Sequence, residues 1–213
     1  MAEPIYHEEL CKATNTPELS ETYNKWSDTY EDETESWGWA PPIITVSTLM
    51  EFVEPENCIV LDAGCGTGSI GALLQMMGFN NIHGIDISDG MLEKARAKSL
   101  YGFDTYNTLE KMDLNQKLSI ESDRYDVVTC GGCISTGAHV QYKALHELIR
   151  VTKPGGIISF TVREIYWHEV NFIEFIKDLE TQGKIDVKKI SRRPYVITSG
   201  EMCLHVTLRV IRS

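Results

Sequence analysis

Long apolar runs, basic residues and internal repeats are all scarce in this sequence of 213 residues. No apolar run approaches the roughly 20 residues that span a bilayer, which argues against a transmembrane helix. Lys and Arg number 20 against 31 Asp and Glu, for a net charge of -11. Because nucleic-acid surfaces need clustered cations to displace counterions, DNA is not expected as a partner. No repeat at a period of roughly 20–50 residues is visible, which excludes a solenoid or propeller.

The remaining composition is that of an ordinary globular protein. Hydrophobic residues make up 42% of the chain and charged residues 24%, which excludes a disordered or collagen-like chain. Because domains usually hold on the order of 100–200 residues, we expect a single domain over 1–213, with an acidic helical segment at 1–40 and an α/β core at 41–213. The acidic start of the chain is unlike a signal peptide. We therefore expect a cytoplasmic protein without a membrane partner.

Negative charge is concentrated near the N-terminus. Residues 1–40 contain ten acidic residues against Lys12 and Lys25. A solvated acidic face explains this bias. An acidic flap over a site that binds a cation is the alternative interpretation, and it stays open at this point.

The cysteines do not form a recognisable metal site. Cys130 and Cys133 have the CxxC spacing, but a zinc site needs two further ligands, and no second CxxC or close His pair exists. A thioredoxin-like centre needs the motif at a helix N-terminus, whereas here it follows a predicted strand. We expect no metal, and we expect buried or site-lining thiols. The six cysteines stand at positions 11, 58, 65, 130, 133 and 203.

Alternating helical and strand-like segments predict the fold. Short apolar runs followed by helical periodicity predict repeated β-α units, and right-handed crossovers then give a doubly wound, mostly parallel α/β sheet. Two terminal strands without a helix between them predict an antiparallel edge, with an antiparallel C-terminal strand. The expected strands cover residues 58–61, 82–85, 105–109, 125–129, 157–162, 185–190 and 204–210. The expected helices cover residues 16–30, 41–53, 69–77, 89–98, 142–151 and 169–180.

A ligand site is expected beyond the carboxyl ends of the central strands, as in other doubly wound sheets. The segments 62–69, 86–88, 113–114 and 130–133 all follow predicted strand ends. The agreement of these four segments predicts one site at a single edge of the sheet.

The glycine-rich segment Asp62-Ala63-Gly64-Cys65-Gly66-Thr67-Gly68 is the strongest motif. Alternating glycines after a buried strand let a ligand approach the backbone, and the next helix start presents N–H groups. Asp86, at the next strand end, is placed to accept hydrogen bonds from two ribose hydroxyls. A shifted frame starting at Gly66 also matches GxGxxG, the dinucleotide fingerprint, so a nicotinamide enzyme remains an alternative. Gly64 before that frame and Asp62 at the strand end count against it.

These motifs resemble those of class I S-adenosylmethionine-dependent methyltransferases. Asp62–Gly68 is similar to the glycine-rich motif, Gly84–Ser88 with Met91 to the second motif, and Lys153–Gly156 to the turn before the fifth strand. Residues 23–31 resemble the N-terminal segment of methyltransferase-like proteins of the Williams–Beuren syndrome chromosomal region type. The resemblance implies a seven-stranded, Rossmann-like sheet with an N-terminal helical lid.

The resemblance also implies a site for S-adenosylmethionine, with S-adenosylhomocysteine as the product. The methionine part would contact the glycine-rich loop and the backbone after the fourth strand. The ribose and adenine would contact the ends of the second and third strands, and aromatic residues would cover the site. The implied cofactor-binding residues are Tyr23, Trp26, Tyr30, Gly64, Cys65, Gly66, Asp86, Ile87, Met91, Asp113, Leu114 and Cys130. For Tyr23, Trp26 and Tyr30, an aromatic stripe packed on the core is an equal alternative.

The acceptor is less well defined by the sequence. The chain has no Asn-Pro-Pro-Tyr motif after the fourth strand. Methylation of an amide or of a nucleic-acid base through such a motif is therefore unsupported. His139 is a candidate base, with a surface histidine as the alternative. We expect a small, uncharged or cationic acceptor and a monomer or homodimer. A protein or RNA methyltransferase with a partner subunit, and a cofactor-binding module without catalysis, are the alternatives.

Overall fold

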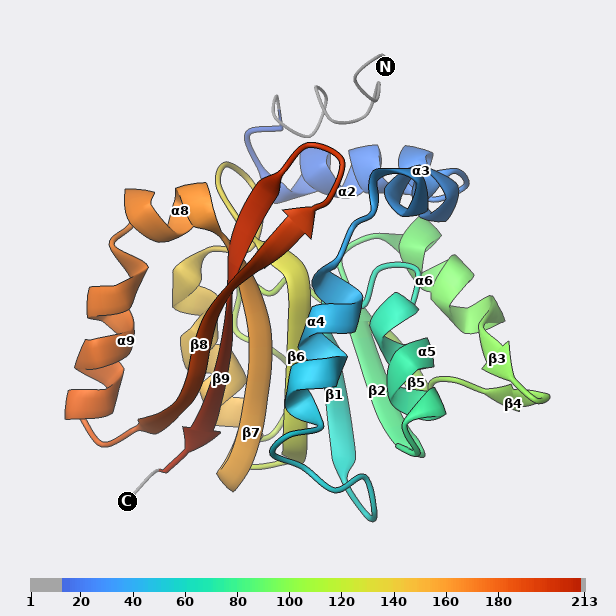
Figure 1. Cartoon of the computed structure of the whole chain (residues 1–213). Helices are drawn as coiled ribbons and strands as arrows, with labels where there is room; N and C mark the ends of the chain where they lie inside the picture. Colours follow the sequence, from blue (N-terminus) through green and yellow to red (C-terminus); the bar gives the residue numbers. More distant parts are fainter. Residues whose placement is uncertain (1–12, 212–213) are drawn as a thin grey trace.

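A twisted seven-stranded sheet runs through the centre of the computed structural model, which describes residues 13–211 (Figure 1). The strand order is β5-β2-β1-β6-β7-β9-β8. Neighbouring strands from β5 to β7 are parallel, whereas β9 is antiparallel to both β7 and β8. The strands are β1 Ile59–Ala63, β2 Asn81–Asp86, β5 Thr108–Lys111, β6 Tyr125–Ile134, β7 Thr152–Arg163, β8 Ile185–Val196 and β9 Glu201–Val210.

The predicted doubly wound sheet with an antiparallel C-terminal strand is confirmed. Its central strands read as apolar runs because both faces are covered, and Val60, Leu61 and Ala63 of β1 are fully buried. The predicted antiparallel edge is confirmed too. The antiparallel strand β9 lies between β7 and β8, and β8 forms the edge.

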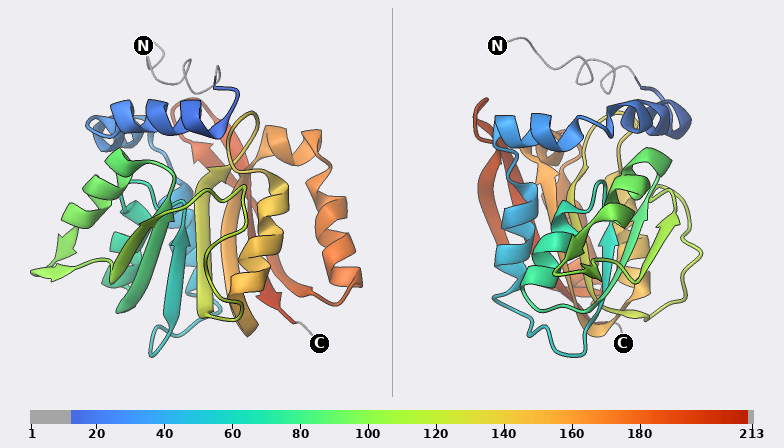
Figure 2. Two further views of the ribbon diagram at one scale, coloured as in Figure 1. Left: turned by 180° about the vertical axis from the view of Figure 1, so that it is seen from behind. Right: turned by 90° about the vertical axis from the view of Figure 1, so that its right-hand side faces the viewer.

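Helices cover both faces of the sheet. In Figure 1, α4 and α5 lie in front of the sheet, and Figure 2 shows α7 on the opposite face. Val46 of α4 and Leu74 of α5 belong to one apolar cluster, and Leu148 of α7 and Ile176 of α9 belong to the other. The helices are α2 Thr16–Trp26, α3 Tyr30–Trp37, α4 Pro41–Leu49, α5 Ser69–Met76, α6 Asp89–Ala97, η1 Tyr142–Ala144, α7 Leu145–Val151, α8 Glu164–Glu169 and α9 Phe172–Thr181.

The N-terminal helices α2 and α3 lie across the end of the sheet where the parallel strands finish (Figure 1). Asn15 caps α2 by accepting a hydrogen bond from the Glu18 N–H at 3.0 Å. The single helix predicted over 16–30 is wrong, because α2 ends at Trp26 and a turn precedes α3. Cys11 and residues 1–12 of the predicted lid lie outside the described residues.

Three further segments differ from the prediction. The helix expected over 169–180 begins at Phe172, and α8 precedes it, with Asn171 in the left-handed region at φ 49°. A small hairpin, β3 Ser99–Leu100 with β4 Phe103–Asp104, was not expected. The strand expected over 105–109 begins at Thr108, and β6 continues through the CxxC segment with an irregular register.

Candidate functional site

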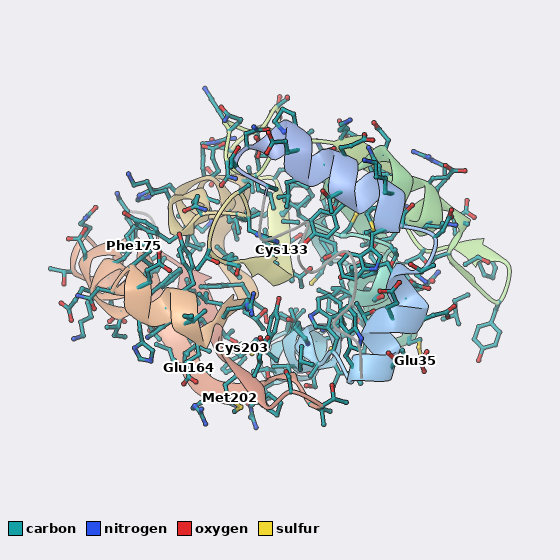
Figure 3. The ribbon with its side chains drawn as sticks, turned by 90° about the horizontal axis from the view of Figure 1, so that it is seen from above. Glu35, Cys133, Glu164, Phe175, Met202 and Cys203 are labelled. Carbon is teal, nitrogen blue, oxygen red and sulfur yellow. The ribbon has the colours of Figure 1, made fainter. Side chains whose placement is uncertain are left out.

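A cavity lies between the carboxyl ends of the central strands and the N-terminal helices, and its empty space together with its solvent-open mouth is about 820 Å³. Seen from above in Figure 3, Cys133 of the lining lies near the centre of this end of the molecule. The lining comprises Thr16, Leu19, Tyr23, Tyr30, Trp39, Pro42, Gly64, Cys65, Gly66, Thr67, Ser69, Ile70, Asp86, Ile87, Met91, Met112, Asp113, Leu114, Asn115, Gly131, Gly132, Cys133, Ala138, His139 and Val140.

The glycine-rich loop forms the floor of this cavity. Gly64, Gly66 and Gly68 all have positive φ, at 71°, 54° and 92°, which L side chains rarely adopt. A Cβ at Gly64 would overlap the Cys133 thiol, whereas a Cβ at Gly66 would meet no atom within 4 Å. Gly64 is therefore required by close packing, and Gly66 borders open space in the cavity.

Asp86 ends β2 beside this loop. One carboxylate oxygen accepts the Gly66 N–H and the other accepts the Ser88 N–H, each at 2.9 Å. Burial raises the pKa of Asp86, and these two backbone hydrogen bonds oppose the rise. Each oxygen retains capacity for a further donor, so the carboxylate can accept hydroxyl groups of a ligand. The predicted cap at Ser88 is confirmed, since its Oγ accepts the Met91 N–H.

A second buried carboxylate, Asp62, lies behind the loop. Its oxygens accept hydrogen bonds from the Tyr106 hydroxyl at 2.7 Å and from the Thr129 Oγ1 at 3.0 Å. Burial raises the pKa of Asp62 to about 6, against the effect of these hydrogen bonds. The contact also explains why β5 begins at Thr108 and not at residue 105 as predicted. The Tyr106 side chain is directed toward Asp62, so this residue does not pair in the strand. The sequence offered no signal for this pair.

We expect an Asp62→Asn variant to be more stable than the wild type at pH 8. A carboxyl whose pKa rises from 3.8 to about 6 on folding favours the folded state below pH 4 and loses that contribution as the pH rises through 6. Asn does not ionise, so the variant avoids the cost of a buried carboxylate. Its free energy of unfolding should therefore exceed that of the wild type by nothing near pH 4 and by at most roughly 3 kcal/mol at pH 8. Urea unfolding at both pH values measures it. An Asn variant that is less stable at pH 8 would contradict the account.

Polar and apolar groups form the far wall of the cavity. Asp113 accepts the Thr16 hydroxyl at 3.1 Å and the Asn115 N–H at 2.8 Å. Leu114 and Ile87 add apolar surface on either side. This pairing of flat apolar surface with acceptors suits a planar ring that carries an amino group.

The N-terminal helices are tied to the loops of the site by hydrogen bonds. The Asn24 Oδ1 accepts from the Ser88 Oγ at 2.8 Å and from the Gly90 N–H at 2.9 Å. The Ser20 hydroxyl donates to the Ile87 carbonyl at 2.8 Å. These contacts join α2 to the β2–α6 connection, so the helices and the cavity form one packed unit.

Two residues of the acidic segment pair with lysines in and directly after α6. Asp28 lies 2.6 Å from Lys94, and Glu31 lies 2.6 Å from Lys98. Neither acid lines the cavity. These two acids therefore fasten α3 and the preceding turn over the site rather than facing a bound cation.

His139 and Tyr23 meet at the cavity wall. The His139 Nδ1 lies 3.0 Å from the Thr136 carbonyl, which places the ring proton on Nδ1. The Nε2 atom then accepts from the Tyr23 hydroxyl, 3.3 Å away. Burial raises the pKa of Tyr23 well above its ordinary value, so the phenol keeps its proton. In this arrangement the Nε2 lone pair is occupied by the Tyr23 hydroxyl, so His139 can take a proton from a ligand only through this hydroxyl or after the hydroxyl turns away.

Most of the residues predicted for the site line the cavity, and two do not. Trp26 is buried among the aromatic rings of α2 and α3, which supports the packing interpretation for that residue. Cys130 is fully buried in β6. Trp39 and Gly132 line the cavity but were not predicted as site residues. Trp39 follows a segment with no site-like pattern, and only its contact with β6 in the fold reveals it.

Metal ligands and membrane spans were also searched among the described residues. Over residues 13–211, no group of three or more His, Cys, Asp or Glu side chains is arranged to hold a metal ion. Within the same range, no helix is long and apolar enough to cross a membrane.

Comparison with known proteins shows which families this chain is similar to. Residues 60–156, from the start of β1 through the glycine turn of β7, match a family model described as a methyltransferase domain. Methyltransferase-like protein 27 of Homo sapiens is 34% identical over 157 residues, covering 71% of this chain and 61% of that protein. These matches support a class I S-adenosylmethionine-dependent methyltransferase. The glycine-rich loop and Asp86 fall inside the matched region.

A second relative is named for methylation of an oxygen atom. The ubiquinone biosynthesis O-methyltransferase of Hydrogenovibrio crunogenus is 28% identical over 149 residues, covering 68% of this chain and 60% of that enzyme. The chain therefore spans about three fifths of the length of these two curated relatives.

Solved structures share the methyltransferase fold with low sequence identity. A complex of the Haloferax volcanii Trm112 methyltransferase activator with a methyltransferase gives a TM-score of 0.65 at 17% identity, covering 89% of this chain and 98% of that one. The cyclase SpnF gives 0.70 at 15% identity, covering 94% and 98%. Because one of these neighbours is named a cyclase, the fold by itself does not define the reaction.

Proposed function

We propose that this chain binds S-adenosylmethionine in the cavity and transfers its methyl group to a small acceptor, leaving S-adenosylhomocysteine. The observation that carries the proposal is the buried Asp86 carboxylate beside the open space at Gly66. Similarity to the methyltransferase family supports the same cofactor.

The residues of the cavity fit the parts of this cofactor. Asp86 offers acceptors to the ribose hydroxyls, and Ile87 and Leu114 offer apolar surface to the adenine ring. Asp113 offers an acceptor to the adenine amino group. The missing side chain at Gly66 leaves room for the methionine part. Cys65 and Met91 complete this side of the pocket.

The chain's own residues position and desolvate the reactants. When bound, S-adenosylmethionine supplies a methyl group that its sulfonium makes electrophilic. The N-terminal helices exclude water from the cavity, and orientation of two bound reactants can contribute roughly 7–11 kcal/mol to a transfer reaction. We assign His139, acting through the Tyr23 hydroxyl that donates to its Nε2, as the base for acceptors that carry a proton they must lose, because both residues line the cavity.

The covered cavity favours a small acceptor. A polymer would have to displace α2 and α3, which are fastened by Asn24 and by two ion pairs. No Lys or Arg is among the described residues of the lining, which disfavours an anionic acceptor. We place the protein in the cytoplasm, as a monomer or homodimer, in keeping with the free thiols of its described cysteines.

A protein methyltransferase with a partner subunit is the second candidate. Tyr101 and Phe103 on the β3–β4 hairpin are 92% and 74% exposed, an apolar surface that a partner would cover. A structural neighbour was solved as a complex with an activator protein. Co-purification of a stable partner, with turnover that depends on it, would favour this candidate.

Transfer of labelled methyl groups to a panel of small amines, phenols and thiols tests the proposal. We expect turnover of at least one class, with His139→Gln losing turnover of phenols at neutral pH and recovering it at alkaline pH. Activity confined to protein or RNA substrates would contradict the small-molecule assignment.

A further inference from the structure

Three aromatic rings line one side of the cavity. Tyr23 comes from α2, Tyr30 from the start of α3, and Trp39 from the link to α4. The rings of Tyr30 and Trp39 are nearly perpendicular, at 82° with centroids 5.9 Å apart. Trp26 stacks on Tyr23 at an interplanar angle of 17°, and His139 meets the Tyr23 ring edge-on. We call Tyr23, Tyr30 and Trp39 the aromatic wall.

The aromatic wall lies beside the bend of the glycine-rich loop. A Cβ at Gly132 would overlap the Trp39 indole, so that ring packs directly on β6. The next residue, Cys133, places its thiol against Gly64. The aromatic wall therefore faces the part of the cavity between the loop and His139, where methyl donor and acceptor would meet.

The position of the Trp39 ring is fixed by contacts with the end of β8. The Ala40 N–H donates to the Tyr195 carbonyl at 3.0 Å, and Trp39 bridges to Val196 of β8. The Tyr195 hydroxyl donates to the Gly132 carbonyl at 3.0 Å. The tip of the β8–β9 hairpin thus holds the indole against β6, as a preorganised binding surface requires.

Charge in this part of the cavity is negative and sparse. Among the described residues of the lining the ionisable acids are Asp86 and Asp113, and neither Lys nor Arg is present. The nearby acids Asp28 and Glu31 already pair with lysines. A cation at the aromatic wall would therefore meet the electron-rich ring faces directly, and the negative charge of Asp86 would add to the attraction.

We propose that the aromatic wall is a binding site for an alkylated onium cation. This inference rests on the proposed function and names a ligand class for the same cavity. The onium group has two sources, the sulfonium of S-adenosylmethionine and an alkylammonium group on the acceptor. Either one places a diffuse positive charge against Tyr30 and Trp39.

The first test compares S-adenosylmethionine, which is a sulfonium, with S-adenosylhomocysteine, which is neutral at sulfur. Calorimetry on wild type, Trp39→Leu and Tyr30→Leu measures both affinities. If the sulfonium occupies the aromatic wall, the ratio of the affinity for S-adenosylmethionine to that for S-adenosylhomocysteine falls roughly 5- to 30-fold in each variant. The binding of S-adenosylhomocysteine itself is retained. That retained binding also reports that the variants fold. Trp37→Leu, a ring of the same cluster outside the lining, is the matched control and should leave the ratio unchanged.

The second test concerns the acceptor side. Tetramethylammonium and the neutral tert-butanol are titrated by NMR into protein saturated with S-adenosylhomocysteine. If an alkylammonium group occupies the wall, tetramethylammonium binds more tightly than tert-butanol, and Trp39→Leu removes the difference. An unchanged affinity ratio in the first test together with no tetramethylammonium preference in the second would overturn the inference. Failure of wild type to bind S-adenosylhomocysteine at all would instead overturn the proposed function, and the inference with it.

Discussion

Asp86→Ala is expected to lower the affinity for S-adenosylmethionine and S-adenosylhomocysteine at least 100-fold. The carboxylate would accept two ribose hydroxyls, and hydrogen bonds to charged groups contribute roughly 1.5–3 kcal/mol each. Its loss would also release the N–H groups of Gly66 and Ser88 that shape the loop. Since 1.4 kcal/mol is about a tenfold change, the two lost hydroxyl contacts alone account for 100-fold or more.

Asp89→Ala is the matched control for this variant. Asp89 lies three residues further along the chain, on the exposed start of α6, and it pairs with Lys111 at 2.5 Å outside the cavity. Asp89→Ala removes one negative charge close to the position where Asp86→Ala removes one. Because surface ion pairs contribute little to stability, the loss of the pair with Lys111 should not unfold the protein. Calorimetry should give wild-type affinities for Asp89→Ala. Equal losses in both variants, or none in Asp86→Ala, would contradict the assigned role of Asp86.

Gly64→Ala and Gly66→Ala are expected to fail in different ways. Both residues have positive φ, so each Ala variant carries a conformational cost of about 1–2 kcal/mol. Only at Gly64 does the new methyl overlap the Cys133 thiol, which adds about 1–3 kcal/mol of overpacking. Gly66→Ala should therefore unfold at the higher urea concentration of the two. Its methyl group points into open cavity space, so it should fold and still bind S-adenosylhomocysteine weakly.

A double-mutant cycle separates the two costs at Gly64. Removing the thiol with Cys133→Ala relieves the overlap and leaves the φ cost. The Gly64→Ala/Cys133→Ala double variant should regain stability relative to Gly64→Ala, measured by urea unfolding. Strict additivity of the two single changes would show that the thiol does not contact Gly64, contrary to the structure.

The parts of this molecule that the sequence could predict are those with regular patterns. The strand before Asp62, the glycine loop and the cap at Ser88 each combine hydrophobic periodicity with a local turn or cap signal. Such features depend on neighbouring residues, and local chemistry is enough to place them. The positions of Asp86 and Asp113 in one cavity followed from the rule that parallel strands end at the same edge.

The parts that were missed depend on contacts between distant segments. The turn after Trp26 interrupts a helical pattern, and the Ser27 hydroxyl there bonds to the Asn24 carbonyl while Asn24 itself binds the start of α6. Tyr106 leaves the predicted strand because Asp62, 44 residues away, accepts its hydroxyl. Trp39 enters the cavity because the β8–β9 hairpin holds it. None of these partners is adjacent in sequence, so periodicity does not reveal them.

The most direct test of the central claim is calorimetric titration of the purified chain with S-adenosylmethionine, S-adenosylhomocysteine and NAD. The account predicts micromolar binding of the first two and none of NAD, because Gly64, Gly66 and Asp86 form a site for one nucleoside with a short methionine chain. Binding of NAD without the other two would contradict it, and would assign the shifted glycine frame at Gly66 to a dinucleotide.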